Sequence, residues 1–230
     1  MMDERFSIKE AIQFGWDTMK NNLFFFVILL IVVIGVSILL DIVSELLILV
    51  PAALFISEDI LLIIVGVILS IIIISITTFV RTLITMGVTK ISLKFSNNEE
   101  GEYEDLISCY PLFFKYLLSS IVYMLIVMGG FILLIIPGII WAIQFQFYNY
   151  FIIDKGLGPI EALKSSSRIT KGVKWKLLGF LIVILLINLV GALALLIGLF
   201  ATIPTTMVAV AFVYRKLSIQ TKPIKTSRKR

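Results

Sequence analysis

Residues 177–214 read LLGFLIVILLINLVGALALLIGLFATIPTTMVAVAFVY, which is 38 consecutive residues without a charged side chain. Residues 116–153 form a second uncharged stretch of 38 residues. One helix of that length would measure about 57 Å, roughly twice the hydrocarbon thickness of a bilayer. Each stretch is therefore predicted to fold back as a hairpin, near Pro137-Gly138 in the earlier stretch and near Thr202 to Pro204 in the later one.

Two shorter uncharged stretches, 23–40 and 60–80, each predict one more membrane span. The hydrophobic content of 60% is far above that of soluble proteins, which supports the same class. We predict an all-α integral membrane bundle of six transmembrane helices in three hairpins, within a single domain over residues 1–217. The predicted spans are about 23–40, 60–80, 116–136, 139–153, 177–197 and 199–214, and residues 218–230 are predicted to be a disordered, basic cytoplasmic tail.

The basic residues predict the orientation of these spans. All 20 Lys and Arg fall within residues 1–22, 81–115, 154–176 and 215–230, whereas residues 41–59 carry four acids and no base. Because cytoplasmic loops are enriched in Lys and Arg, both termini and the loops 81–115 and 154–176 are predicted to be cytoplasmic. The acids Asp41, Glu45, Glu58 and Asp59 are then predicted to lie outside.

The apolar segment 46–56 does not fit this count of spans. Its 11 residues are too few to cross a bilayer, and it contains Pro51. It could extend the first helix, lie in the outer interface, or enter the membrane and return on the same side. We favour a helix on the outer surface.

Each hairpin is predicted to follow a cytoplasmic interfacial helix. Apolar residues recur at helical spacing from Ile8 to Leu23, opposite Lys9 and Lys20, just before the first hairpin. Residues 103–115 and 160–176 precede the other two hairpins in the same way, so the chain is interpreted as three parallel repeats.

Several short motifs resemble those of a known family. They are Pro137-Gly138-Ile139, Asp154-x-Gly156-x-Gly158-Pro159-x-Glu161-Ala162-Leu163-x-x-Ser166, Thr170-Lys171-Gly172 and the N-terminal Ile8-x-x-Ala11-x-x-x-Gly15-Trp16. Together they resemble a family of small multi-pass prokaryotic membrane proteins related to the membrane domain of glycerophosphoryl diester phosphodiesterases. The resemblance implies a prokaryotic cytoplasmic (inner) membrane protein. Relatives often carry a basic residue and an aromatic residue where this chain has Gln144 and Ser167.

Few residues suit catalysis or cofactor binding. The chain has no His and only one Cys, Cys109, so a metal site built on His or on clustered Cys is excluded. The four outer acids could form a metal or acid/base cluster, but we interpret them as charges tolerated on the outer side. No catalytic residue, cofactor or metal is predicted, and the chain is not expected to be an enzyme.

Two groups of residues remain as candidate sites. Gln144, Asn149 and Asn188 are intramembrane polar residues, interpreted as interhelical hydrogen-bonding groups, with a substrate cavity as the alternative. Within the loop 154–176, residues 164–176 hold five bases and no acid. This loop is predicted to bind anionic lipid headgroups rather than nucleic acid, through Lys164, Arg168, Lys171, Lys174 and Lys176.

The expected function is that of a non-enzymatic membrane protein that organises or senses lipid or partners another membrane protein. Its expected partners are the phospholipid bilayer, with its anionic lipids, and a second membrane protein. A small-molecule or lipid transporter is the alternative, and the membrane accessory domain of a phosphodiesterase system is a second one. The absence of charged residues within the spans argues against a transporter coupled to protons or ions.

Overall fold

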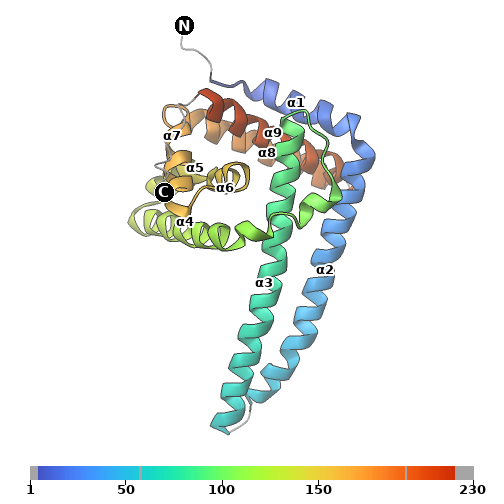
Figure 1. The fold of residues 1–230 in the computed structure, drawn as a ribbon, viewed down its shortest axis with the longest axis vertical. Coiled ribbons are helices and arrows are strands. Elements are labelled where there is room, and N and C mark those ends of the chain that lie inside the picture. Colours follow the sequence, from blue (N-terminus) through green and yellow to red (C-terminus); the bar gives the residue numbers. More distant parts are fainter. Residues whose placement is uncertain (1–4, 57–58, 195, 221–230) are drawn as a thin grey trace, which may run out of the picture.

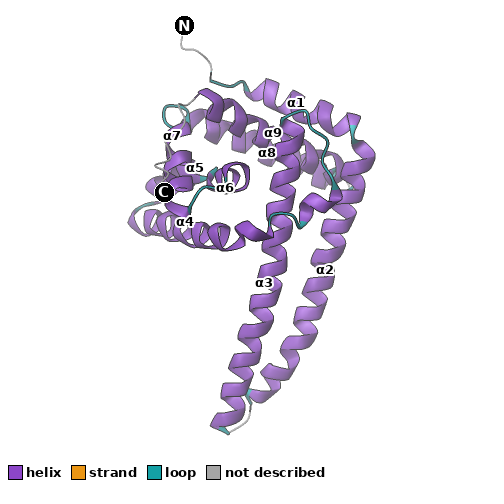
Figure 2. Cartoon of the chain, in the orientation of Figure 1, coloured by secondary structure: helices purple, strands orange, loops and turns teal. Residues whose placement is uncertain are grey.

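The computed structural model describes residues 5–56, 59–194 and 196–220, and confirms the all-helical fold class, with no strand among these residues (Figures 1 and 2). Two 3-10 turns, η1 (Tyr103–Leu106) and η2 (Tyr110–Leu112), lead into α4. The α-helices are α1 (Ile8–Asn21), α2 (Leu23–Leu54), α3 (Ile60–Ser96), α4 (Phe113–Leu133), α5 (Ile135–Phe145), α6 (Tyr148–Lys155), α7 (Pro159–Ile169), α8 (Lys174–Leu193) and α9 (Leu199–Gln220).

The long antiparallel pair α2 and α3 projects away from a head formed by the other helices (Figure 1). We call this pair the hairpin. Helix α1 lies across its head end and packs along α9, which also contacts α3 and α8. The predicted disordered tail begins too early at residue 218, because α9 continues to Gln220, and residues 221–230 lie outside the described residues.

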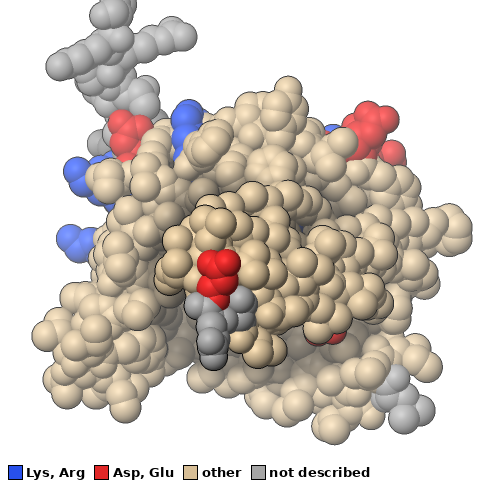
Figure 3. Space-filling view, turned by 90° about the horizontal axis from the view of Figure 1, so that it is seen from below, with Lys and Arg blue, Asp and Glu red and all other residues tan. Residues whose placement is uncertain are grey.

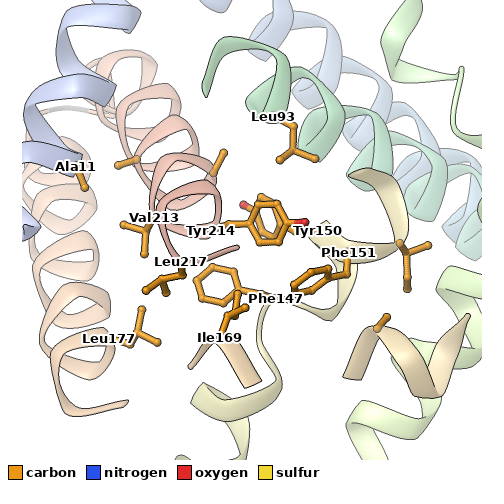
Figure 4. Close-up of a cluster of buried hydrophobic side chains, with 14 of the residues drawn as sticks. Ala11, Leu93, Phe147, Tyr150, Phe151, Ile169, Leu177, Val213, Tyr214 and Leu217 are labelled. Atoms are coloured by element: carbon orange, nitrogen blue, oxygen red, sulfur yellow. The ribbon is translucent and has the colours of Figure 1, made fainter. Parts of the chain in front are cut away.

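An aromatic cluster forms the centre of the head (Figure 4). Tyr214 of α9 has no exposed surface and stacks on Tyr150 of α6, with ring centroids 5.2 Å apart, while Phe147 and Phe151 complete the cluster. The Tyr214 hydroxyl donates to Asp154 Oδ2 at 2.8 Å, which gives this buried polar group a partner. The cluster joins α9 to α6 next to the connection that leads into α7.

Among the residues that the structure describes, four helical stretches are long and apolar enough to cross a membrane. They are Leu23–Leu54, Ile60–Ser96, Tyr103–Leu133 and Lys174–Leu193. Large apolar side chains cover the outside of the hairpin, and most of the surface seen from its tip carries neither acid nor base (Figure 3). Such a surface is typical of a protein surrounded by lipid.

The structure divides one of the six predicted spans. Residues 139–153 form parts of α5 and α6, which are only 11 and 8 residues long and are separated at Gln146 and Phe147. Neither piece approaches the 20 or so residues that a straight span needs. The sixth predicted span, 199–214, lies within α9, which is not among the four long apolar stretches.

The segment 46–56 continues the first long helix instead of forming a separate surface helix, so our favoured interpretation was wrong. Helix α2 runs without interruption to Leu54, with Pro51 in its last turn. Pro51 cannot donate a backbone hydrogen bond, yet α2 continues for three residues beyond it. Of the three alternatives, the structure shows the extension of the first helix.

An ion pair between Asp41 and Arg81 joins the two helices of the hairpin partway along their length. This contact contradicts the predicted placement of Asp41 outside and Arg81 inside, because two residues in contact cannot lie on opposite sides of a bilayer about 30 Å thick. The contact also pairs the end of the predicted span 23–40 with the end of 60–80. These two uncharged stretches are therefore offset along the hairpin and do not lie side by side.

Two further details of the repeats differ from prediction. Residues 103–115 form η1, η2 and the start of α4, not an interfacial helix, and Pro111 interrupts helical hydrogen bonding there. The chain reverses direction between the end of α8 and the start of α9 at Leu199. Pro204 therefore lies inside α9 and not at the turn. Gly191 and Gly198 allow this early reversal, because a Cβ on Gly198 would lie 2.6 Å from the Gly191 carbonyl oxygen.

Candidate functional site

Helix α7 stabilises the break between α5 and α6 with two buried hydroxyl groups. Ser166 Oγ accepts a hydrogen bond from the Phe147 backbone N–H at 3.0 Å and donates to the Gln144 carbonyl oxygen, also at 3.0 Å. Thr170 Oγ1 lies 3.1 Å from the same carbonyl oxygen. Both hydroxyls are buried, so they replace helical backbone bonds that the break removes.

The side chain of Gln144 extends this junction to α8. Its Nε2 donates to Ser167 Oγ at 2.7 Å, and its Oε1 accepts from Lys174 Nζ. Gln144 and Ser167 are 23 positions apart in the sequence, and the structure places them in contact. Both belong to one junction, in which Lys174 supplies the positive charge.

The five bases of the loop 154–176 that were predicted to bind headgroups divide into two groups. Lys164 and Arg168 lie on the exposed face of α7, and Lys171 follows in the turn, while the opposite face of α7 is buried against the head. None of these three forms an ion pair with a carboxylate in the described part of the chain. Lys174 instead bonds to Gln144, and Lys176 Nζ lies 5.2 Å from the centre of the Phe6 ring.

Sequence reasoning missed a fourth base beside this face. The Arg5 guanidinium donates to the Lys171 carbonyl oxygen at 2.8 Å, so the start of the chain lies against the turn after α7. No local pattern links two residues that are 166 positions apart. We define the basic face as Arg5, Lys164, Arg168 and Lys171.

The three predicted intramembrane polar residues have separate partners. Asn188 Nδ2 donates to Thr206 Oγ1 at 3.2 Å, which links α8 to α9, while Gln144 joins α7 and α8. Asn149 Oδ1 accepts from the Tyr150 backbone N–H at 2.9 Å. The Asn188 bond is of the interhelical kind, and such bonds are worth about 0.6 kcal/mol on average in membrane proteins.

A second charged cluster fixes the connection between α3 and α4. Lys90 Nζ lies 2.9 Å from Asp105 Oδ1, and Lys94 Nζ lies 2.7 Å from Asp105 Oδ2. Asp105 is in η1, and the Glu102 backbone N–H also donates to its Oδ2 at 3.0 Å. These three donors surround the carboxylate and hold η1 against α3.

Cys109 lies next to this cluster. It is a free thiol and is buried. A buried free thiol behaves as a small apolar side chain.

Over its described residues the protein is all-helical, with four helical stretches long and apolar enough to cross a membrane and a polar junction in its head. Residues 112–221 match the model of a domain of unknown function, DUF7847. This match begins at the end of η2 and covers the junction of Gln144, Ser166 and Lys174 together with α8 and α9. No curated protein and no solved structure matches the chain significantly.

Proposed function

We propose that this chain is a non-enzymatic, multi-pass protein of a prokaryotic cytoplasmic membrane that organises anionic lipid at the inner leaflet. The observation that supports this proposal is the exposed basic face. Lys164, Arg168 and Lys171 have no carboxylate partner among the described residues, and the face adjoins helices whose outward surfaces are apolar. Cations placed at the edge of an apolar surface favour contact with phosphate groups of lipids.

The magnitude of this attraction suits lipid recruitment better than anchoring. Near an anionic leaflet each base contributes about 1 kcal/mol, and salt screens part of that attraction. Helices that cross a membrane already hold a protein there almost irreversibly. The four bases of the face would therefore concentrate anionic lipid around α7 and the start of α8.

The transport alternative has less support. A substrate cavity lined by Gln144 and Asn188 would require these side chains to face a common space, whereas each bonds to different neighbours. The link to phosphodiesterase systems rests on the resemblance alone and stays a prediction.

The basic face is tested by a pair of variants that remove the same charge. Lys164→Gln with Arg168→Gln removes two bases from the face, and Lys9→Gln with Lys20→Gln removes two exposed bases from α1. Each variant is reconstituted in bilayers that mix phosphatidylglycerol with phosphatidylcholine, and the lipid retained around the protein is measured by native mass spectrometry. We expect the first variant to lose enrichment in phosphatidylglycerol and the second to keep it.

Two results would overturn the proposal. One is equal enrichment in the parent and the α7 variant at low ionic strength. The other is an equal loss in both variants, because lipid would then respond to net charge and not to this face.

A further inference from the structure

A groove between α5 and α8 lies beside the junction of Gln144 and Lys174. Its volume is about 290 Å³, and it is partly open to the outside. Apolar side chains form most of its wall, with one ammonium group and one indole, and the lining residues are Ile136, Ile139, Ile140, Ile143, Lys174, Trp175 and Leu178. The lining of the groove is therefore apolar apart from a single cation, Lys174.

No acid among the described residues neutralises this cation. Lys174 is half-buried, its Nζ bonds to the neutral Gln144 Oε1, and it forms no ion pair with a described carboxylate. An ammonium group has three N–H donors, and removing it partly from water without a counter-ion costs free energy. An anion at this position would offset that cost.

The size and the openness of the groove limit what can occupy it. The lining residues of α5 extend from Ile136 to Ile143, which is about 10 Å of helix at about 1.5 Å per residue. The volume of about 290 Å³ is at the lower limit of ordinary ligand pockets, which hold roughly 300–1,000 Å³. One aliphatic chain fits such a space better than two chains.

Trp175 places the cation end of the groove near the membrane surface. Its side chain is 75% exposed, and exposed tryptophans concentrate at the boundary between headgroups and hydrocarbon. Ile136 at the other end is 67% exposed, so a chain could enter sideways from the surrounding lipid. The groove thus has a charged end at headgroup level and an apolar end within the hydrocarbon.

We infer that this groove binds one aliphatic chain of an anionic amphiphile, with the carboxylate or phosphate of its headgroup paired to Lys174. This inference rests on the proposed function, because it assumes that α8 begins at the anionic leaflet. It adds a defined site for a single lipid to the general attraction of the basic face.

Tryptophan fluorescence provides a direct test. The chain has three Trp residues, so Trp16→Phe with Trp141→Phe leaves Trp175 as the only fluorophore. This parent protein, in uncharged detergent, is titrated with dibrominated stearic acid, with brominated-chain phosphatidylglycerol and with brominated-chain phosphatidylcholine. We expect saturable quenching by one or both anionic probes, reversed by the unbrominated compound, and weak quenching by phosphatidylcholine. Comparison of the two anionic probes identifies the headgroup, carboxylate or phosphate.

Three variants separate the groove from its surroundings. Lys174→Gln removes the cation and should weaken binding of the anionic probe about tenfold or more, as expected for a hydrogen bond to a charged group. Ile140→Phe fills the groove and should abolish saturable quenching with Lys174 intact. Lys20→Gln, on α1 and outside both the groove and the basic face, should bind as the parent does.

Unchanged half-saturation in both Lys174→Gln and Ile140→Phe would overturn the inference, as would equal quenching by phosphatidylcholine. Either result would leave the test of the basic face untouched, since that test measures enrichment of lipid around Lys164 and Arg168.

Discussion

The Ser166 hydroxyl bonds to the backbone groups that lack a helical partner where α5 meets α6. One hydroxyl accepts from the Phe147 N–H and donates to the Gln144 carbonyl oxygen, so the break leaves neither group without a partner. A buried N–H that loses its acceptor costs about 1–3 kcal/mol.

We predict that Ser166→Ala lowers the free energy of unfolding by about 1–3 kcal/mol, measured by denaturant unfolding in detergent. Ser75→Ala is the matched control, because Ser75 is exposed on α3 and its hydroxyl bonds only to the Ile71 carbonyl oxygen of its own helix. The control should change stability by less than about 0.5 kcal/mol. Equal losses in the two variants would mean that Ser166 does not stabilise the break.

At this scale the sequence predicted some residues of the site but not their roles. The loop bases and Gln144 were selected because charge and polarity stand out in an apolar chain. The role of Ser166 could not be predicted, because its partners are 19 and 22 residues away and become available only where the helix breaks. The place of Arg5 in the basic face could not be predicted for the same reason, since only the fold brings it next to Lys171.

Among the elements, α3 is held to the following connection by close contact of backbones. A Cβ added to Gly87 would lie 2.2 Å from the Leu106 Cα and 2.3 Å from its carbonyl oxygen. The ion pairs of Asp105 with Lys90 and Lys94 hold η1 at the same place. The absence of a side chain at Gly87 is therefore a condition for this packing.

We predict that Gly87→Ala destabilises the protein by about 1–3 kcal/mol, as overpacking of a tight contact does. Gly129→Ala in α4 is the control, since nothing lies within 4 Å of the added Cβ there. Because Ala is a better helix former than Gly, the control should be neutral or more stable by up to about 1 kcal/mol. The midpoint of thermal unfolding is measured for both variants and for the parent. A Gly87→Ala variant as stable as the parent would contradict the close contact between Gly87 and Leu106.

The positions of charges define the ends of the uncharged stretches, but they did not predict where the helices end. Helix α2 passes through Asp41 because Arg81 pairs with it, so a charge that predicted a helix end lies in the middle of one. The break after α5 has no charge or glycine at Gln146 and Phe147 to predict it. Partners on other helices decide both cases, and a single sequence does not identify them.

For the molecule as a whole, the hairpin is longer than a bilayer is thick. Helices α2 and α3 contain 32 and 37 residues, or about 48 and 56 Å at about 1.5 Å per residue, against a hydrocarbon layer of about 30 Å. A strong tilt or a headgroup region around part of the hairpin would accommodate the difference.

The proposed orientation predicts opposite accessibility for the two ends of the hairpin. In a Cys109→Ser background, Ile56→Cys near the tip should react with an impermeant thiol reagent added to intact cells, because Ile56 is 86% exposed and is placed outside. Glu100→Cys, after the other end of α3, should react only after the cells are permeabilised. Labelling of Glu100→Cys in sealed cells would contradict the orientation.

The Asp41–Arg81 pair also has a consequence for biosynthesis. Arg81 is synthesised 40 residues after Asp41. The charge of Asp41 in α2 is therefore unpaired until α3 has been synthesised. A lone charge near the middle of an inserting helix costs about 2.5–3.5 kcal/mol at the translocon. We therefore expect the two helices to enter the membrane together. Arg81→Gln should lower the protease-protected fraction in an insertion assay, Asp41→Asn with Arg81→Gln should restore it, and equal protection of both variants would show that each helix inserts alone.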